Sequence, residues 1–128
     1  MGQPVTRFGP RILSVRLKLV DKHAHHRHVT LVSAYAPHSG RSQSDRDAFH
    51  LSLQECISAC PSSDLLVIGS DTNASVGVRC DSDPDRVRGP NGIPHVNAAG
   101  ASLHDLLSMN DLCLPTTFFQ KKVSRGDE

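Results

Sequence analysis

The sequence has few of the residues from which aromatic binding surfaces and membrane segments are built. Its 128 residues contain no tryptophan and one tyrosine, and aromatic residues make up 4% of the chain. No apolar run approaches the length of a membrane span, and the polar N-terminal arm predicts no secretory signal. The formal net charge is +1, so no overall field steers the protein towards nucleic acid or membranes. Any contact with nucleic acid therefore has to come from local basic groups.

Cysteine and histidine are present without a recognisable metal spacing. The four cysteines form no CxxC pair and no Cys/His zinc pattern. Their distribution favours reduced thiols that pack as small apolar groups, which is typical of an intracellular protein. The segment HisAlaHisHisArgHis (23 to 28) has the ligands for a transition metal, but an exposed hairpin connection is the stronger interpretation.

Hydrophobic periodicity predicts alternating strands and helices. Apolar and polar residues alternate in RILSVRLKLV (11 to 20), which is typical of a strand whose Leu13, Val15 and Leu17 side is buried. Helical spacing of apolar residues predicts a helix over 45–59, with a capping box formed by Ser44 and Asp47. The remaining predictions are strands at 29–35, 65–69 and 112–119, a long loop over 77–96, and a helix from 97 or 98 to 109, which Asn110 ends. The strand at 65–69 is apolar throughout, which is typical of burial on both faces.

These elements predict the α/β class, with a mixed sheet in a single domain over 1–128. The first two strands form a hairpin, and helices connect the later ones. Two helices can cover only one face of so small a sheet, so the other face should expose leucine and valine. We therefore expect the chain to be an incomplete domain.

A short motif follows the predicted strand at 65–69. The sequence reads ValIleGlySerAspThrAsnAla from 67 to 74. In an extended backbone Asp71 and Asn73 point to the same side, at the carboxyl end of a strand, where open α/β sheets bind ligands. A carboxylate can activate water or hold a hard cation, and an amide can donate to a phosphate oxygen. A strand-ending Asx turn is the alternative, and from these residues alone it is the stronger of the two.

The order of several motifs resembles the endonuclease/exonuclease/phosphatase superfamily, which has the deoxyribonuclease-I-like fold. SerAlaTyrAlaPro (33 to 37) precedes IleGlySerAspThrAsnAla (68 to 74) by the length of a helix and a strand. Gly89, Pro90, Asn97, Gly100 and Leu103, followed by ThrThrPhePhe (116 to 119), resemble the endonuclease domains of non-LTR retrotransposons. The similarity runs from about residue 12 to 119. The sequence departs from the family pattern at Thr72, where an aromatic residue is usual, and at Thr116, where the family has asparagine.

The resemblance implies a fold, a substrate and a set of roles. The fold would be part of a four-layer α/β sandwich with mixed sheets, and the activity would be Mg²⁺-dependent hydrolysis of a phosphodiester in DNA. Asp71 would position or activate the attacking water, Asn73 would hold a phosphate oxygen, and the Tyr35 hydroxyl would stabilise developing charge. Substrate binding is implied for a second group of residues: His38, Arg41 and Asn97. Arg41 could pair with a phosphate of the DNA backbone, and a solvated loop charge is the equal alternative.

Two parts of the family pattern are missing from the sequence, the metal-binding Glu before the hairpin and the Asp-His pair after the last strand. Asp71 and Asn73 supply too few ligands for a complete Mg²⁺ site, and no general base is evident. We therefore expect an intracellular protein, with the nucleus as a candidate compartment, that is inactive or nearly so by itself. Two alternatives stay open: a non-catalytic remnant or nucleic-acid-binding module on the same scaffold, and a phosphatase branch of the superfamily.

Overall fold

The computed structural model describes residues 5–38, 40–79 and 86–118. The chain forms two compact units, Met1–Asn73 and Ala74–Glu128. Among the described residues, no helix is both long and apolar enough to cross a membrane.

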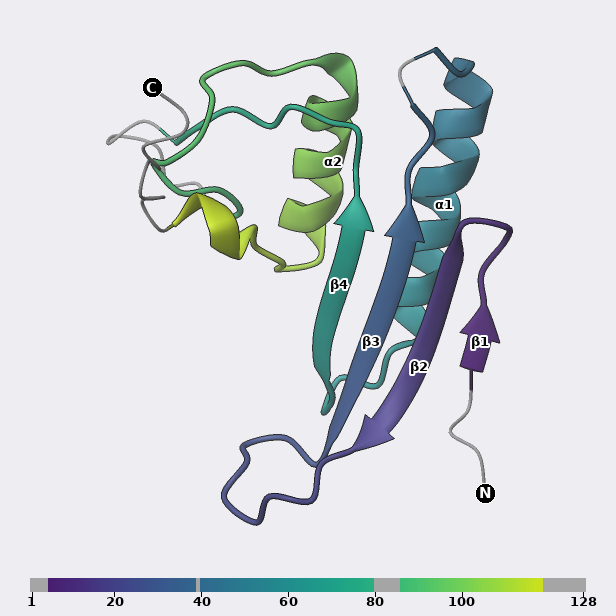
Figure 1. Cartoon of the computed structure of the whole chain (residues 1–128), viewed down its shortest axis with the longest axis vertical. Coiled ribbons are helices and arrows are strands. Elements are labelled where there is room, and N and C mark those ends of the chain that lie inside the picture. The colour runs from purple at the N-terminus through teal and green to yellow at the C-terminus, as the bar shows by residue number, and fades with distance from the viewer. Residues whose placement is uncertain (1–4, 39, 80–85, 119–128) are drawn as a thin grey trace, which may run out of the picture. The chain divides into compact units, whose positions relative to one another are not determined.

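A four-stranded mixed sheet organises the first unit (Figure 1). Its strands are β1 (Val5–Arg7), β2 (Ile12–Lys18), β3 (His28–Tyr35) and β4 (Leu65–Asp71), and they lie side by side in that order. The pairs β1–β2 and β2–β3 are antiparallel, whereas β3–β4 is parallel. The predicted hairpin and the predicted α/β class with a mixed sheet are therefore confirmed. The three-residue strand β1 was not predicted, because three residues are too few to show a period.

The helix α1 (Gln43–Ala59) connects β3 to β4 and lies against one face of the sheet (Figure 1). It begins two residues earlier than predicted, because Ser42 is the N-cap and its side chain accepts a hydrogen bond from the Asp45 backbone N–H. The capping box predicted from Ser44 and Asp47 is therefore wrong. The buried side of α1 carries four apolar residues: Phe49, Leu53, Cys56 and Ile57.

The predicted strand over 11–20 is observed, but its buried side was assigned the wrong way round. Ile12 is 1% exposed, whereas Leu13 is 40% exposed. The register places Ile12 beside the buried Ala34, and Ser14 beside the buried Val32. Alternation along a strand shows that two faces differ, but it does not show which face the helix will cover. The helix here covers the face that carries Ile12.

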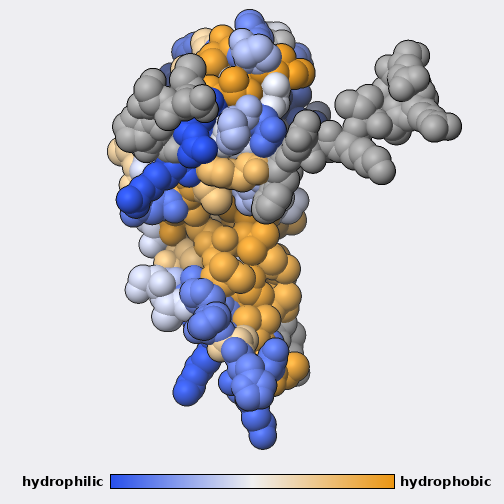
Figure 2. Space-filling model, turned by 90° about the vertical axis from the view of Figure 1, so that its left-hand side faces the viewer, coloured by the Kyte–Doolittle hydropathy of each residue, from blue (hydrophilic) through white to orange (hydrophobic). Residues whose placement is uncertain are grey.

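The sheet face that points away from α1, called the outer face below, carries most of the exposed apolar residues of this unit. Its large exposed side chains are Val5, Leu13, Leu31, Leu65 and Val67. Figure 2 shows hydrophobic side chains gathered on the β4 side of the molecule. The predicted exposure of leucine and valine on one sheet face is thus observed. The prediction that β4 is buried on both faces is wrong, because Leu65 is 43% exposed and Val67 is 45% exposed on the outer face.

The second unit contains α2 (Ala98–Met109) and the short 3₁₀ helix η1 (Pro115–Thr117). The helix α2 begins at Ala98, one of the two predicted starts, with Asn97 as its N-cap, and Asn110 caps its end, as predicted. The buried side of the helix carries Gly100, Leu103, Leu106 and Leu107. The strand predicted over 112–119 is wrong within the described residues: Pro115 starts η1 instead, because its fixed φ suits the first turn of a helix. Residue 119 lies outside the described range.

Candidate functional site

Tyr35 and Asp71 are partners in the register of the parallel strands β3 and β4. Each residue is the last of its strand, so both lie at the carboxyl edge of the sheet. Partner residues on adjacent strands share a face, and the two strands lie about 5 Å apart. Tyr35 is 55% exposed and Asp71 is exposed. A phenol and a carboxylate therefore stand side by side, accessible to a ligand, on the outer face of the sheet.

Asn73 lies just beyond β4 and does not continue its extended backbone. Its φ is 47°, in the left-handed region, and its backbone N–H donates to Asp71 Oδ1 over 3.3 Å. This is an Asx turn, so the prediction that Asp71 and Asn73 lie on one extended strand is wrong. The Asn73 side chain donates one N–H to the Ala36 carbonyl oxygen at 3.0 Å. Since Ala36 follows Tyr35, the amide ties the end of β3 to the turn that carries Asp71.

The loop after β3 carries two residues for which the sequence implied contacts to DNA. His38 and Arg41 are both exposed, and the Gly40 backbone N–H donates to His38 Nδ1 at 3.1 Å. The Arg41 guanidinium lies 4.0 Å from the Asp45 carboxylate in the first turn of α1. Both side chains are more than half exposed, so this ion pair is weak and leaves the guanidinium accessible to an anion.

Asn97 is part of the second unit, so its position relative to Tyr35 and Asp71 is not described. Its Oδ1 accepts two backbone hydrogen bonds, from Gly100 at 2.7 Å and from Ser75 at 3.1 Å. The Asn97 backbone N–H donates to the Ser75 carbonyl oxygen at 3.1 Å. The structure thus gives Asn97 a capping role, and it leaves only the amide NH₂ for the implied contact to substrate.

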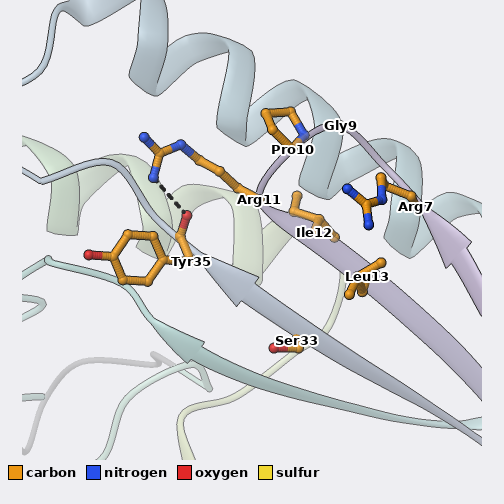
Figure 3. Close-up of a pocket in the computed structure, with 8 residues that line it drawn as sticks. All are labelled: Arg7, Gly9, Pro10, Arg11, Ile12, Leu13, Ser33 and Tyr35. Carbon is orange, nitrogen blue, oxygen red and sulfur yellow. Dashed lines mark hydrogen bonds between the residues drawn. The ribbon is translucent and has the colours of Figure 1, made fainter.

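A shallow pocket of about 450 Å³ opens beside Tyr35, and its basic residues were not singled out from the sequence (Figure 3). Arg7, Arg11, Ser33 and Tyr35 supply its polar groups. One feature of the sequence could have identified Arg11 as a residue near Tyr35. Pairing the predicted strand at 11–20 with the one at 29–35 brings Arg11, at the start of the first, next to Tyr35, at the end of the second.

The described residues contain no group of three or more His, Cys, Asp or Glu side chains that could hold a metal ion. Within the HisAlaHisHisArgHis segment, His26 Nδ1 instead hydrogen-bonds the Ser63 carbonyl oxygen at 3.0 Å. At the carboxyl edge of the sheet, Asp71 supplies a single carboxylate. Mg²⁺ often binds proteins through one or two carboxylates, with water and substrate phosphates as its other ligands. Asp71 therefore fits a cation that is shared with a bound phosphate, not one held by protein ligands alone.

The edge of the sheet thus presents hydroxyl and guanidinium donors around one carboxylate, and such donors form charge-assisted hydrogen bonds with anions. No family model, curated protein or solved structure matches the chain.

Proposed function

We propose that this chain carries the phosphate-binding edge of a Mg²⁺-dependent phosphodiesterase domain that acts on DNA. The domain would be of the endonuclease/exonuclease/phosphatase type, closest to the endonucleases of non-LTR retrotransposons. The observation that carries the proposal is the register of the parallel strands, in which Tyr35 is the partner of Asp71. A shift by one residue would place the phenol and the carboxylate on opposite faces of the sheet.

Each residue at this edge has a role that follows from its chemistry. The Tyr35 hydroxyl would donate a hydrogen bond to a non-bridging oxygen of the phosphate. The second N–H of the Asn73 amide would do the same, since the first donates to Ala36. Asp71 would orient the attacking water or share a cation with the phosphate. Arg41, in the loop after β3, would contact a neighbouring phosphate of the DNA backbone.

The role of Mg²⁺ in this proposal is limited to what Asp71 can hold. Asp71 would hold the ion, which when bound would neutralise negative charge on the phosphate. Without the ion, Asp71 would repel the same phosphate, because two negative charges would face each other. The proposal therefore predicts how Mg²⁺ changes DNA binding, apart from any turnover.

Replacing Asp71 by asparagine is expected to reverse the effect of Mg²⁺ on DNA binding. The unsubstituted chain should bind a fluorescent 10-nucleotide DNA roughly fivefold more tightly in Mg²⁺ than in EDTA at matched ionic strength, about 1 kcal/mol for one shared cation. Asp71→Asn should bind more tightly than the unsubstituted chain in EDTA, because the repulsion is gone, and should gain nothing from Mg²⁺. Fluorescence anisotropy titrations measure all four affinities.

Glu55→Gln is the matched control, since it removes one exposed carboxylate from α1 in the same unit. It should keep the Mg²⁺ response of the unsubstituted chain. If Asp71→Asn and Glu55→Gln respond alike to Mg²⁺, Asp71 holds no cation at the phosphate and the proposal fails.

The single carboxylate at this edge favours a second candidate, a nucleic-acid-binding module without catalytic activity. Under both candidate functions, the purified chain and its Asp71→Ala variant should nick a supercoiled plasmid in Mg²⁺ at the same low rate. DNA binding that is tight and indifferent to Mg²⁺ would favour the module. Mg²⁺-dependent nicking that Asp71→Ala abolishes would show instead that these residues suffice for hydrolysis.

A further inference from the structure

We infer that Arg7 and Arg11 form a second phosphate subsite beside Tyr35, so that the substrate is a polynucleotide strand, not a small phosphate monoester. This inference rests on the proposed function, because it takes Tyr35 as the group that meets the reacting phosphate. The subsite is the pocket on the outer face that Arg7 and Arg11 line, beside the exposed apolar side chain of Leu13 (Figure 3).

Strand pairing explains how two arginines reach the same pocket. Arg7 ends β1 and is the register partner of Leu13, which is in turn the partner of Ser33. Arg11 precedes β2, and its backbone carbonyl accepts a hydrogen bond from the Tyr35 N–H at 3.0 Å. The turn between β1 and β2 therefore brings both side chains to the end of the sheet where β3 finishes.

The Arg11 guanidinium is already oriented towards the tyrosine. Its Cζ lies 5.6 Å from the centroid of the Tyr35 ring, a cation–π distance, and Nη1 lies 3.5 Å from the Tyr35 carbonyl oxygen. Arg16 forms an ion pair with Asp64, and Arg41 forms one with Asp45, within the residues that the structure describes. Neither Arg7 nor Arg11 takes part in one, so their charge is available to an anion.

Polarity changes sharply along the outer face. The row of partners Val5, Val15, Leu31 and Val67 is entirely apolar, as is the row Leu17, Val29 and Leu65. The row nearer the carboxyl edge contains Arg7 and Ser33, and the last row contains Tyr35 and Asp71. Within the four strands, the arginines of this face are thus confined to the end that carries the proposed reacting group. A strand with one phosphate at Tyr35 and the next at the arginines fits this arrangement, and the apolar side chain of Leu13 suits the sugar between them.

The test is binding of a fluorescent 10-nucleotide thymidine oligonucleotide to the full chain, in EDTA at about 0.1 M salt. Each lost phosphate contact on a single strand lowers the slope of log affinity against log salt by about 0.7, which corresponds to roughly fivefold at this salt concentration. Arg11→Gln and Arg7→Gln should each weaken binding by about that factor, and the double variant by roughly 25-fold. Arg27→Gln, an exposed arginine in the connection between β2 and β3, is the control and should change the slope little.

Three outcomes decide the inference. If the Arg7→Gln/Arg11→Gln double variant binds the oligonucleotide as tightly as the Arg27→Gln control does, the inference is overturned. The second outcome compares two competitors, inorganic phosphate and unlabelled oligonucleotide, at the same total concentration of phosphate groups. If both displace the fluorescent oligonucleotide to the same extent, the pocket holds a single phosphate and the inference is overturned. Loss of affinity and of salt slope in the double variant, with the Mg²⁺ response through Asp71 intact, would support it. A missing Mg²⁺ response in the unsubstituted chain would count against the proposed function alone.

Discussion

Replacing Gly100 by alanine is expected to destabilise the Ala74–Glu128 unit by about 3 kcal/mol, the upper end of the cost of overpacking. A β-carbon at position 100 would run into the backbone carbonyl group of Ser75. The obstacle is main chain, so no rotamer change can relieve it. The Ser75 segment or the first turn of α2 would have to move.

The segment around Ser75 cannot move freely, because Asn97 holds it in two places. The Asn97 backbone N–H donates to the Ser75 carbonyl, and Asn97 Oδ1 accepts from the Ser75 N–H. The same oxygen accepts from the Gly100 N–H, which caps the helix. One asparagine thus joins the start of α2 to the chain that follows β4, and only glycine leaves room for that chain to pass.

Hydrogen exchange of the Leu106 and Leu107 amides, together with thermal unfolding followed by circular dichroism, measures the loss. Asn97→Ala should cost about 1 kcal/mol, the usual value for an N-cap. Ser102→Ala, at an exposed position two residues further along α2, should change little. If the Leu106 and Leu107 amides are as well protected from exchange in Gly100→Ala as in Ser102→Ala, the close approach of residue 100 to Ser75 is not required for the stability of the unit.

The same geometry gives the spacing of Asn97 and Gly100 a structural role, beside the substrate contact implied for Asn97. In the sequence, Asn97 and Gly100 were identified as part of a retrotransposon-like motif, and the resemblance implied a substrate contact for Asn97. In the structure their spacing of three residues is that of an N-cap and the backbone N–H it accepts. A motif can follow a family pattern because it shapes the backbone, and sequence alone does not separate that from contact with a ligand.

Local patterns predicted the two helices and the strands β2, β3 and β4, whereas the arrangement of the site depends on long-range pairing. Asp71 was expected from its place after an apolar strand, and the pairing with Tyr35 needed the parallel alignment of β3 and β4. Arg7 was missed because β1 has only three residues. Asn73 was expected on an extended strand, but its positive φ comes from an Asx turn that two residues can form by themselves. That turn had been recognised as the stronger alternative.

Asp64 was not expected to matter, yet it joins the three main strands at the end of the sheet opposite Tyr35. Its carboxylate accepts two hydrogen bonds from the Arg16 guanidinium, both 2.8 Å, and one from the Thr30 hydroxyl at 2.8 Å. The Asp64 side chain is 1% exposed. Arg16 and Thr30 are partners across β2 and β3, and Asp64 immediately precedes β4. The carboxylate therefore helps to fix the register that places Tyr35 beside Asp71.

Replacing Asp64 by asparagine is expected to lower the midpoint of thermal unfolding by about 5 °C or more near pH 7, because it leaves a guanidinium beside the buried position without its counter-ion. The hydrogen bonds from Arg16 lower the pKa of Asp64 to about 2 against the effect of burial, and Thr30 and the charges of Arg16 and His28 lower it further. A lowered carboxyl pKa gives stability that is complete above the unfolded value, near 4, and is lost as the pH falls towards 2. The difference between the two proteins should therefore be constant from pH 7 to about 5 and should shrink below pH 4.

Asp47→Asn is the control for this experiment, since it removes an exposed carboxylate from α1 and should lower the midpoint by far less. A midpoint difference for Asp64→Asn that stays the same from pH 7 to pH 2 would show that the charge of Asp64 does not stabilise the sheet. Hydrogen exchange tests separately whether Asp64 fixes the register of β3 and β4. Backbone amides of these strands should exchange faster in Asp64→Asn than in the unsubstituted chain, and Asp47→Asn should leave their exchange unchanged. A sheet that stays fully protected without the carboxylate would place the determinant of the Tyr35–Asp71 pairing in the apolar contacts of α1 instead.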